Sequence, residues 1–121
     1  MALASTTATN QALDGMNAVG TPTNLMSHVA LHTATTLTTG ASEATGGGYA
    51  RQACSWNAAA SGSKTNSTAL TFTTTGGTAN TYFGTWSAST AGTFGIGGAL
   101  TSSVTAVTIT VAAGALTLTA A

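Results

Sequence analysis

Charged side chains are scarce in this chain of 121 residues, where they make up 3% of the sequence: Asp14, Glu43, Arg51 and Lys64. Globular domains ordinarily carry about 25% charged residues. Disorder does not explain the difference, because disordered chains are usually charge-rich, whereas 43% of this chain is apolar. With a formal net charge of zero, the molecule lacks the repulsion that keeps soluble monomers apart. We therefore expect a self-associating subunit of an assembly; the alternative is an extracellular domain kept soluble by its hydroxyl groups.

Cysteine is almost missing as well, and the single Cys54 excludes an internal disulfide. We expect it to be a small buried apolar residue. Two cations cannot neutralise many phosphates, so nucleic acid is a poor partner. The N-terminus lacks the basic flank and apolar core of a secretory signal, so we expect none. The most apolar stretch, 104–121, is interrupted by threonines and a glycine and falls short of a membrane span.

The segment 1–22 has the pattern of a helix or arm that precedes the rest of the domain. Gly20 and Pro22 give it a stop signal. Apolar residues recur before them at helical spacing, namely Ala8, Ala12, Met16 and Val19, with Leu13 beside them. Three turns of helix are not stable alone. We therefore expect this segment to dock on its own sheet or on a neighbouring subunit, with Leu13 and Met16 as candidate protein contacts.

From Leu25 onward the apolar residues alternate with polar ones, which predicts strands. In the first of these strands Leu25, Val29 and Leu31 share one face. The segments with a strand pattern are 25–32, 49–57, 69–73, 81–87, 93–96, 104–111 and 115–119. The stretches between them are rich in glycine, serine and threonine and predict loops, including 61–66. About seven short strands with frequent turns predict a mainly β chain, a small antiparallel β-sandwich or barrel over 23–121 with one short N-terminal helix.

No arrangement of residues suited to catalysis emerges. His28 and His32 are the only candidate metal ligands, and on a strand their spacing separates them by about 13 Å, too far to share one ion. With two carboxylates, Asp14 and Glu43, a paired-carboxylate site is barely available. The glycine runs lack the lysine of a phosphate-binding loop and the third glycine of a dinucleotide site. We predict that the protein is not an enzyme and has no metal and no cofactor.

The stretch GGYARQACSWNAA at 47–59 resembles a signature of a family of small tailed-bacteriophage virion proteins, usually labelled tail fibre or minor tail protein. Further similar segments lie in the expected order, at 28–34 before this stretch and at 82–88, 92–101 and 112–118 after it. Members often have a Val-Pro turn where this chain has TTTGG at 73–77. The resemblance implies a non-enzymatic virion component. The small size and missing charge of the domain suit a decoration protein on the head as well as a tail component, and we expect the protein to be made in the host cytoplasm.

The leading hypothesis is thus a structural virion protein that associates with itself and with major capsid or tail proteins. Glu43 and Arg51 are candidate protein contacts in addition to the N-terminal segment. Arg51 needs an anionic partner if it is buried, and either Glu43 or Asp14 could supply the charge.

Two other functions compete with this hypothesis. A carbohydrate- or receptor-binding module could stack sugars on Trp56, Tyr82 and Trp86, although a small sandwich also needs large residues in its core. Alternate threonines at 71/73, 108/110 and 117/119 could form an ice-binding array, or simply reflect the preference of threonine for strands.

Overall fold

The structure is a computed structural model that describes residues 25–34 and 39–119. The predicted N-terminal helix, with Leu13 and Met16, lies outside these residues. The described part contains eight strands and no helix, and hence none that could span a membrane. The strands are β1 (His28–His32), β2 (Gln52–Ala53), β3 (Ser63–Thr65), β4 (Leu70–Thr73), β5 (Asn80–Trp86), β6 (Phe94–Val104), β7 (Thr108–Val111) and β8 (Thr117–Thr119).

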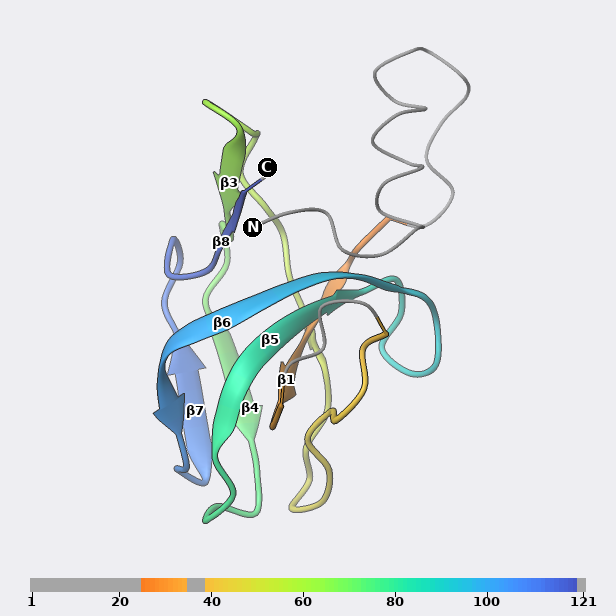
Figure 1. The fold of residues 1–121 in the computed structure, drawn as a ribbon, viewed down its shortest axis with the longest axis vertical. Helices are drawn as coiled ribbons and strands as arrows, with labels where there is room; N and C mark the ends of the chain where they lie inside the picture. Colours follow the sequence, from red (N-terminus) through yellow and green to blue (C-terminus); the bar gives the residue numbers. More distant parts are fainter. Residues whose placement is uncertain (1–24, 35–38, 120–121) are drawn as a thin grey trace.

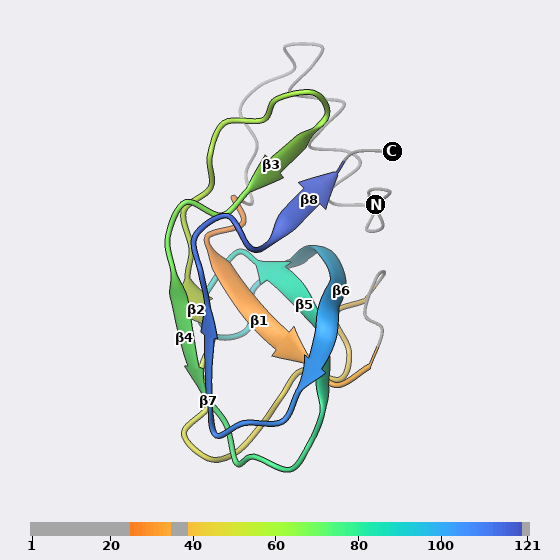
Figure 2. The same cartoon turned by 90° about the vertical axis from the view of Figure 1, so that its left-hand side faces the viewer.

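All strand pairings among the described residues are antiparallel, which confirms the predicted mainly β, antiparallel architecture. The main sheet has the order β2-β1-β5-β6, and β3–β8 and β4–β7 form two smaller sheets. Figure 1 shows β5 and β6 curving across the molecule, with β3 and β8 at one end. In Figure 2, β4 and β7 lie along one side and β5 and β6 along the other, so that two layers enclose the core.

The core is filled by apolar side chains from both layers. They come from β1 and β5 on one side and from β4, β7 and the region of β8 on the other: Val29, Leu31, Phe83, Leu70, Phe72, Ile109, Leu116 and Leu118. On β4 burial follows the pleat, because Leu70 and Phe72 are buried while Thr71 and Thr73 are exposed. The pairs Thr71–Thr110 and Thr73–Thr108 place four threonines on the outer face of this small sheet.

Two of the predicted strands begin or end elsewhere. Leu25 does not share the core face with Leu31, because β1 begins only at His28 and Leu25 is 67% exposed. The strand predicted at 49–57 shrinks to β2, and the backbone N–H of Tyr49 donates to the carbonyl oxygen of Gly46 in a turn instead of pairing with a strand. Trp56 forms only an isolated bridge with Asn66. The loop predicted at 61–66 contains β3, which is held by its pairing with β8.

The long strand β6 differs most from the prediction, which ended at 96 and began again at 104. The strand continues through its glycines because their lack of a side chain is needed there. A Cβ atom at Gly97 would lie 2.5 Å from the carbonyl oxygen of Phe83, which no larger residue tolerates. The strand predicted at 104–111 is divided between β6 and β7 by the turn at 105–107.

The central strand β1 is buried on both of its faces. Val29 and Leu31 point into the core, while the alternate residues Ala30 and His32 are also buried. The loop around Ala41 covers that second face, where the Ala41 carbonyl oxygen lies 2.8 Å from Nδ1 of His32. A second packed layer therefore lies outside the main sheet, and it holds most of the ionisable groups in the described residues.

Candidate functional site

The outer layer is built around three aromatic rings. The His32 and Trp86 rings stack with centroids 6.3 Å apart and an interplanar angle of 7°. Phe94 packs edge-on against both rings, at centroid distances of 6.4 and 5.4 Å. Gly84 makes room for this cluster, because a Cβ atom there would lie 2.7 Å from Nε2 of His32. The rings are thus fixed by the backbone of the main sheet.

His32 is fully buried. Its Nδ1–H donates to the carbonyl oxygen of Ala41 at 2.8 Å, which leaves Nε2 to accept from the indole N–H of Trp86 at 3.5 Å. Burial lowers the pKa of His32 and outweighs the opposing effects of the Ala41 hydrogen bond and of the Glu43 charge.

We expect acid to weaken folding through His32. Its pKa in the folded state lies below the ordinary value of 6.5, so the unfolded chain takes up the proton first as pH falls. This contribution to stability is present above pH 6.5 and is lost as pH falls through the lower folded-state pKa. Denaturant unfolding from pH 7 to pH 5 should show a decreasing free energy of unfolding. His32→Gln should flatten that dependence, and an unchanged slope would contradict the prediction.

Arg51 joins two loops at the edge of this aromatic layer, the β1–β2 connection that contains both Arg51 and Glu43, and the β5–β6 loop. Its Nε and Nη2 donate to the two carboxylate oxygens of Glu43 at 2.8 and 2.9 Å. Its Nη1 donates to the carbonyl oxygens of Ala88 and Ala91 at 3.0 and 2.7 Å. The guanidinium carbon lies 3.7 Å from the ring centroid of Trp86, a cation–π contact. We call this group of residues, Glu43, Arg51, Trp86, Ala88 and Ala91, the Arg51 cluster.

Tyr49 links the Arg51 cluster to the core. Its hydroxyl group donates to Glu43 at 3.1 Å and accepts from the backbone N–H of Leu31 at 3.0 Å. Its ring stacks on Phe72 with centroids 6.3 Å apart. Burial raises the pKa of Tyr49. Burial alone would also raise the pKa of Glu43, but the hydrogen bond and charge of Arg51 lower it below the ordinary value of 4.5.

The structure brings together two of the residues selected from the sequence. Arg51 pairs with Glu43, one of its two candidate partners, and their side chains are 8% and 21% exposed. Such burial leaves little of either side chain for another molecule, and their role as protein contacts stays a prediction. Cys54 is a buried free thiol, as expected. Among the described residues no group of three or more His, Cys, Asp or Glu forms a metal site.

The three candidate aromatic residues are all half-buried. Trp56 is half-buried and packs against the core. Trp86 lies in the outer layer, where the guanidinium group of Arg51 covers one face of its indole. Tyr82 is half-buried on β5, opposite His32 of β1. Stacking of a sugar on Trp86 would therefore have to compete with Arg51.

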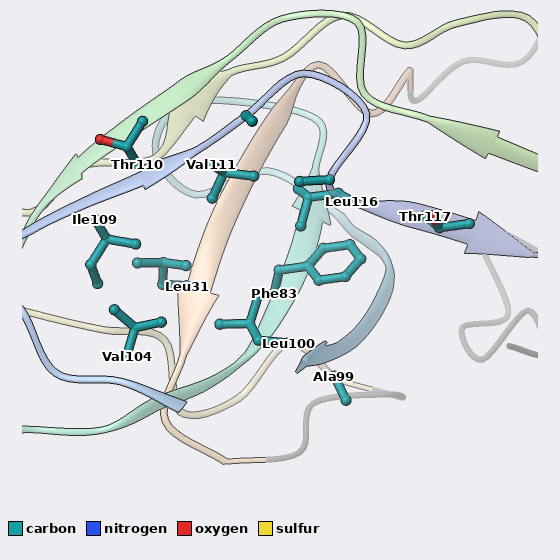
Figure 3. A pocket seen from close by; sticks show the side chains of 12 residues that line it. Leu31, Phe83, Ala99, Leu100, Val104, Ile109, Thr110, Val111, Leu116 and Thr117 are labelled. Atoms are coloured by element: carbon teal, nitrogen blue, oxygen red, sulfur yellow. The ribbon is translucent and has the colours of Figure 1, made fainter. Parts of the chain in front are cut away.

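A cavity of about 310 Å³ opens between β6 and β7, where the two layers are not hydrogen-bonded to each other. Leu31 and Phe83 line it from the main sheet, as Figure 3 shows. The other labelled apolar side chains around it are Ala99, Leu100 and Val104 of β6, Ile109 and Val111 of β7, and Leu116. The sequence carried no signal for this cavity, because its lining comes from five separate parts of the chain.

The fold and its polar groups define a small structural β-sandwich domain, in which the described ion pair fastens loops together. The family model described as Podophage GP4 fiber I protein gp80 matches residues 3–119. The chain belongs to this phage fibre family, which confirms the resemblance to tail-fibre proteins. It is therefore a structural protein and a virion component. No curated protein matches the chain.

Proposed function

We propose that this chain is a rigid, self-associating domain of a podophage tail fibre and not a head decoration protein. The observation that carries the proposal is the family match over 3–119, since the description of that family names a fibre protein. The alternative location on the head has no comparable support.

The distribution of charge supports self-association. Glu43 and Arg51 neutralise each other inside the Arg51 cluster, and Lys64 lies on β3. No charged residue follows Lys64, so β4 to β8 are uncharged. Copies of such a domain can approach one another without electrostatic repulsion.

The packing supports a load-bearing role in a fibre. The central strand is covered on both faces, and the β1–β2 and β5–β6 loops are fastened together by side-chain hydrogen bonds of Arg51. Buried strands and well-packed cores open only at a large part of the global free energy of unfolding. The domain thus suits a part that must transmit force without deforming.

Copy number in purified particles tests the location. Quantitative mass spectrometry against the major capsid protein should give a few copies per particle, as a tail fibre requires. Antibody labelling of intact particles should mark the tail. A copy number close to that of the capsid protein, or label spread over the head, would establish a decoration protein and contradict the proposal.

A further inference from the structure

We propose that a polar pocket at one end of the sandwich binds a single neutral saccharide ring through its hydroxyl groups. The pocket has a volume of about 230 Å³ and lies where β1 and β4 end and β5 begins, away from β3 and β8 (Figure 1). We call it the Asn80 pocket; its lining residues are Thr33, Glu43, Ala44, Thr45, Thr74, Thr75, Thr78 and Asn80. The inference goes beyond the proposed function and does not depend on it.

Asn80 gives this pocket a hydrogen-bond acceptor that the protein itself does not use. The residue is 2% exposed, and its Nδ2 donates to the carbonyl oxygens of Val104 at 3.2 Å and Thr78 at 3.4 Å, which fixes the orientation of the amide. Its Oδ1 is the one buried side-chain nitrogen or oxygen atom without a partner in the part of the chain that the structure describes. Because an unpaired buried acceptor is unfavourable, this atom requires a donor that the described residues do not supply.

Threonine hydroxyl groups make up most of the remaining polar lining. The hydroxyl group of Thr74 is engaged, because it donates to the carbonyl oxygen of Ala106 at 2.8 Å and accepts from the backbone N–H of Gly76 at 3.1 Å. Thr45 and Thr78 are exposed, and their hydroxyl groups form no hydrogen bond with another described residue. A hydroxyl group both donates and accepts. The Asn80 pocket therefore offers two unused hydroxyl groups in addition to its buried acceptor.

The charge of the Asn80 pocket favours an uncharged ligand. Glu43 is the only charged residue in its lining, and both of its carboxylate oxygens already accept hydrogen bonds from Arg51, with a further one from the hydroxyl group of Tyr49. The ion pair is neutral, so a cation in the pocket would remain without a counter-ion. No cationic side chain lines the pocket to hold an anion. A neutral ligand with several hydroxyl groups matches the polar groups that are left.

The size of the pocket limits this ligand to about one ring. Its 230 Å³ is less than the about 300 to 1,000 Å³ of pockets for drug-sized ligands. A saccharide ring carries hydroxyl groups around its edge, which can exchange hydrogen bonds with Thr45 and Thr78. Because Oδ1 of Asn80 is buried, a ligand hydroxyl reaches it most simply through one bridging water, which is enthalpically nearly as good as a direct hydrogen bond. The threonine methyl groups and Ala44 provide apolar contact for the C–H groups of the ring.

An NMR titration of the isotope-labelled full-length chain tests the proposal, with glucose, galactose and N-acetylglucosamine as separate probes. At least one sugar should shift the backbone amide signals of Thr45 and Thr78 and the side-chain amide signals of Asn80 along a saturating curve. Thr78→Val keeps the shape of the side chain but removes its hydroxyl group, and should weaken binding about threefold to tenfold. Thr71→Val is the matched control, because Thr71 is also exposed but lies on β4 outside the pocket. It should bind like the wild type.

Four outcomes would overturn the proposal. No sugar shifts these signals, or the shifts lie elsewhere on the chain, or Thr71→Val weakens binding as much as Thr78→Val, or glycerol binds as tightly as the sugars and so marks an adventitious additive only. Shifts at the pocket with N-methylacetamide but not with sugars would indicate a peptide partner and would equally contradict it. If Thr78→Val does not fold, Thr45→Val takes its place. The purified chain is used throughout, so failure here leaves the fibre assignment to the copy-number measurement.

Discussion

Leu31→Ala should lower the free energy of unfolding by about 3 to 5 kcal/mol, whereas Leu25→Ala should change it by less than about 0.5 kcal/mol. The two leucines have the same chemistry and lie six residues apart in the sequence. Leu31 is 1% exposed in the core, and Leu25 is 67% exposed before the start of β1. The pair therefore separates the effect of burial from that of residue type.

The expected loss of stability in Leu31→Ala is large because the core cannot collapse into the space that the leucine side chain leaves. Leu31 already borders the cavity between the layers, so its truncation enlarges an existing void in a core with few other side chains. Domains of this kind are stable by about 5 to 15 kcal/mol in total. Urea unfolding followed by the fluorescence of Trp56 and Trp86 measures both variants. Equal effects at the two positions would show that the predicted common face of Leu25 and Leu31 exists after all.

Arg51→Ala should lower the free energy of unfolding by about 2 to 4 kcal/mol. The change leaves the Glu43 carboxylate without its counter-ion and leaves the carbonyl groups of Ala88 and Ala91 without their donor. Removing one partner of a buried ion pair costs about 3 to 5 kcal/mol. The expected loss is smaller, because the Glu43 side chain is 21% exposed and water can reach it.

Lys64→Ala is the matched control for Arg51→Ala, because it removes the same charge from a residue that is only half-buried on β3. It should cost less than about 1 kcal/mol. In Arg51→Ala the fluorescence emission of Trp86 should shift to longer wavelength, since its covered face becomes exposed to water. A loss in Lys64→Ala as large as that in Arg51→Ala would show that net charge, and not the Arg51 cluster, sets the stability.

The sequence predicted the fold best where a strand has one buried and one exposed face. On β4 and β7 apolar residues alternate with threonines, and burial alternates with them. Alternation of apolar and polar residues did not predict β6, because glycine carries no preference for strands. Glycine is needed there because the backbone of Phe83 approaches closely. The pattern also failed for Leu25, since alternation continues past the point where the strand pairing ends.

The candidate site was predictable in part. The need of a buried Arg51 for an anion limited its partners to two, and Glu43 proved to be the partner. The contact of Arg51 with Trp86 and with the carbonyl groups of Ala88 and Ala91 could not be foreseen, because it depends on how the 88–91 loop folds back. The cavity could not be predicted from the sequence either, since no local pattern marks residues that meet only in the folded chain.

The Arg51 cluster also affects how readily trypsin cleaves this protein. Trypsin cleaves after arginine and lysine, and the chain has only Arg51 and Lys64. In the folded state the side chain of Arg51 is occupied by Glu43 and Trp86, and Lys64 lies within a paired strand. Digestion must therefore follow unfolding, and it then releases one short peptide, 52–64, between two long ones. That peptide is the natural reporter for detecting this chain in particles.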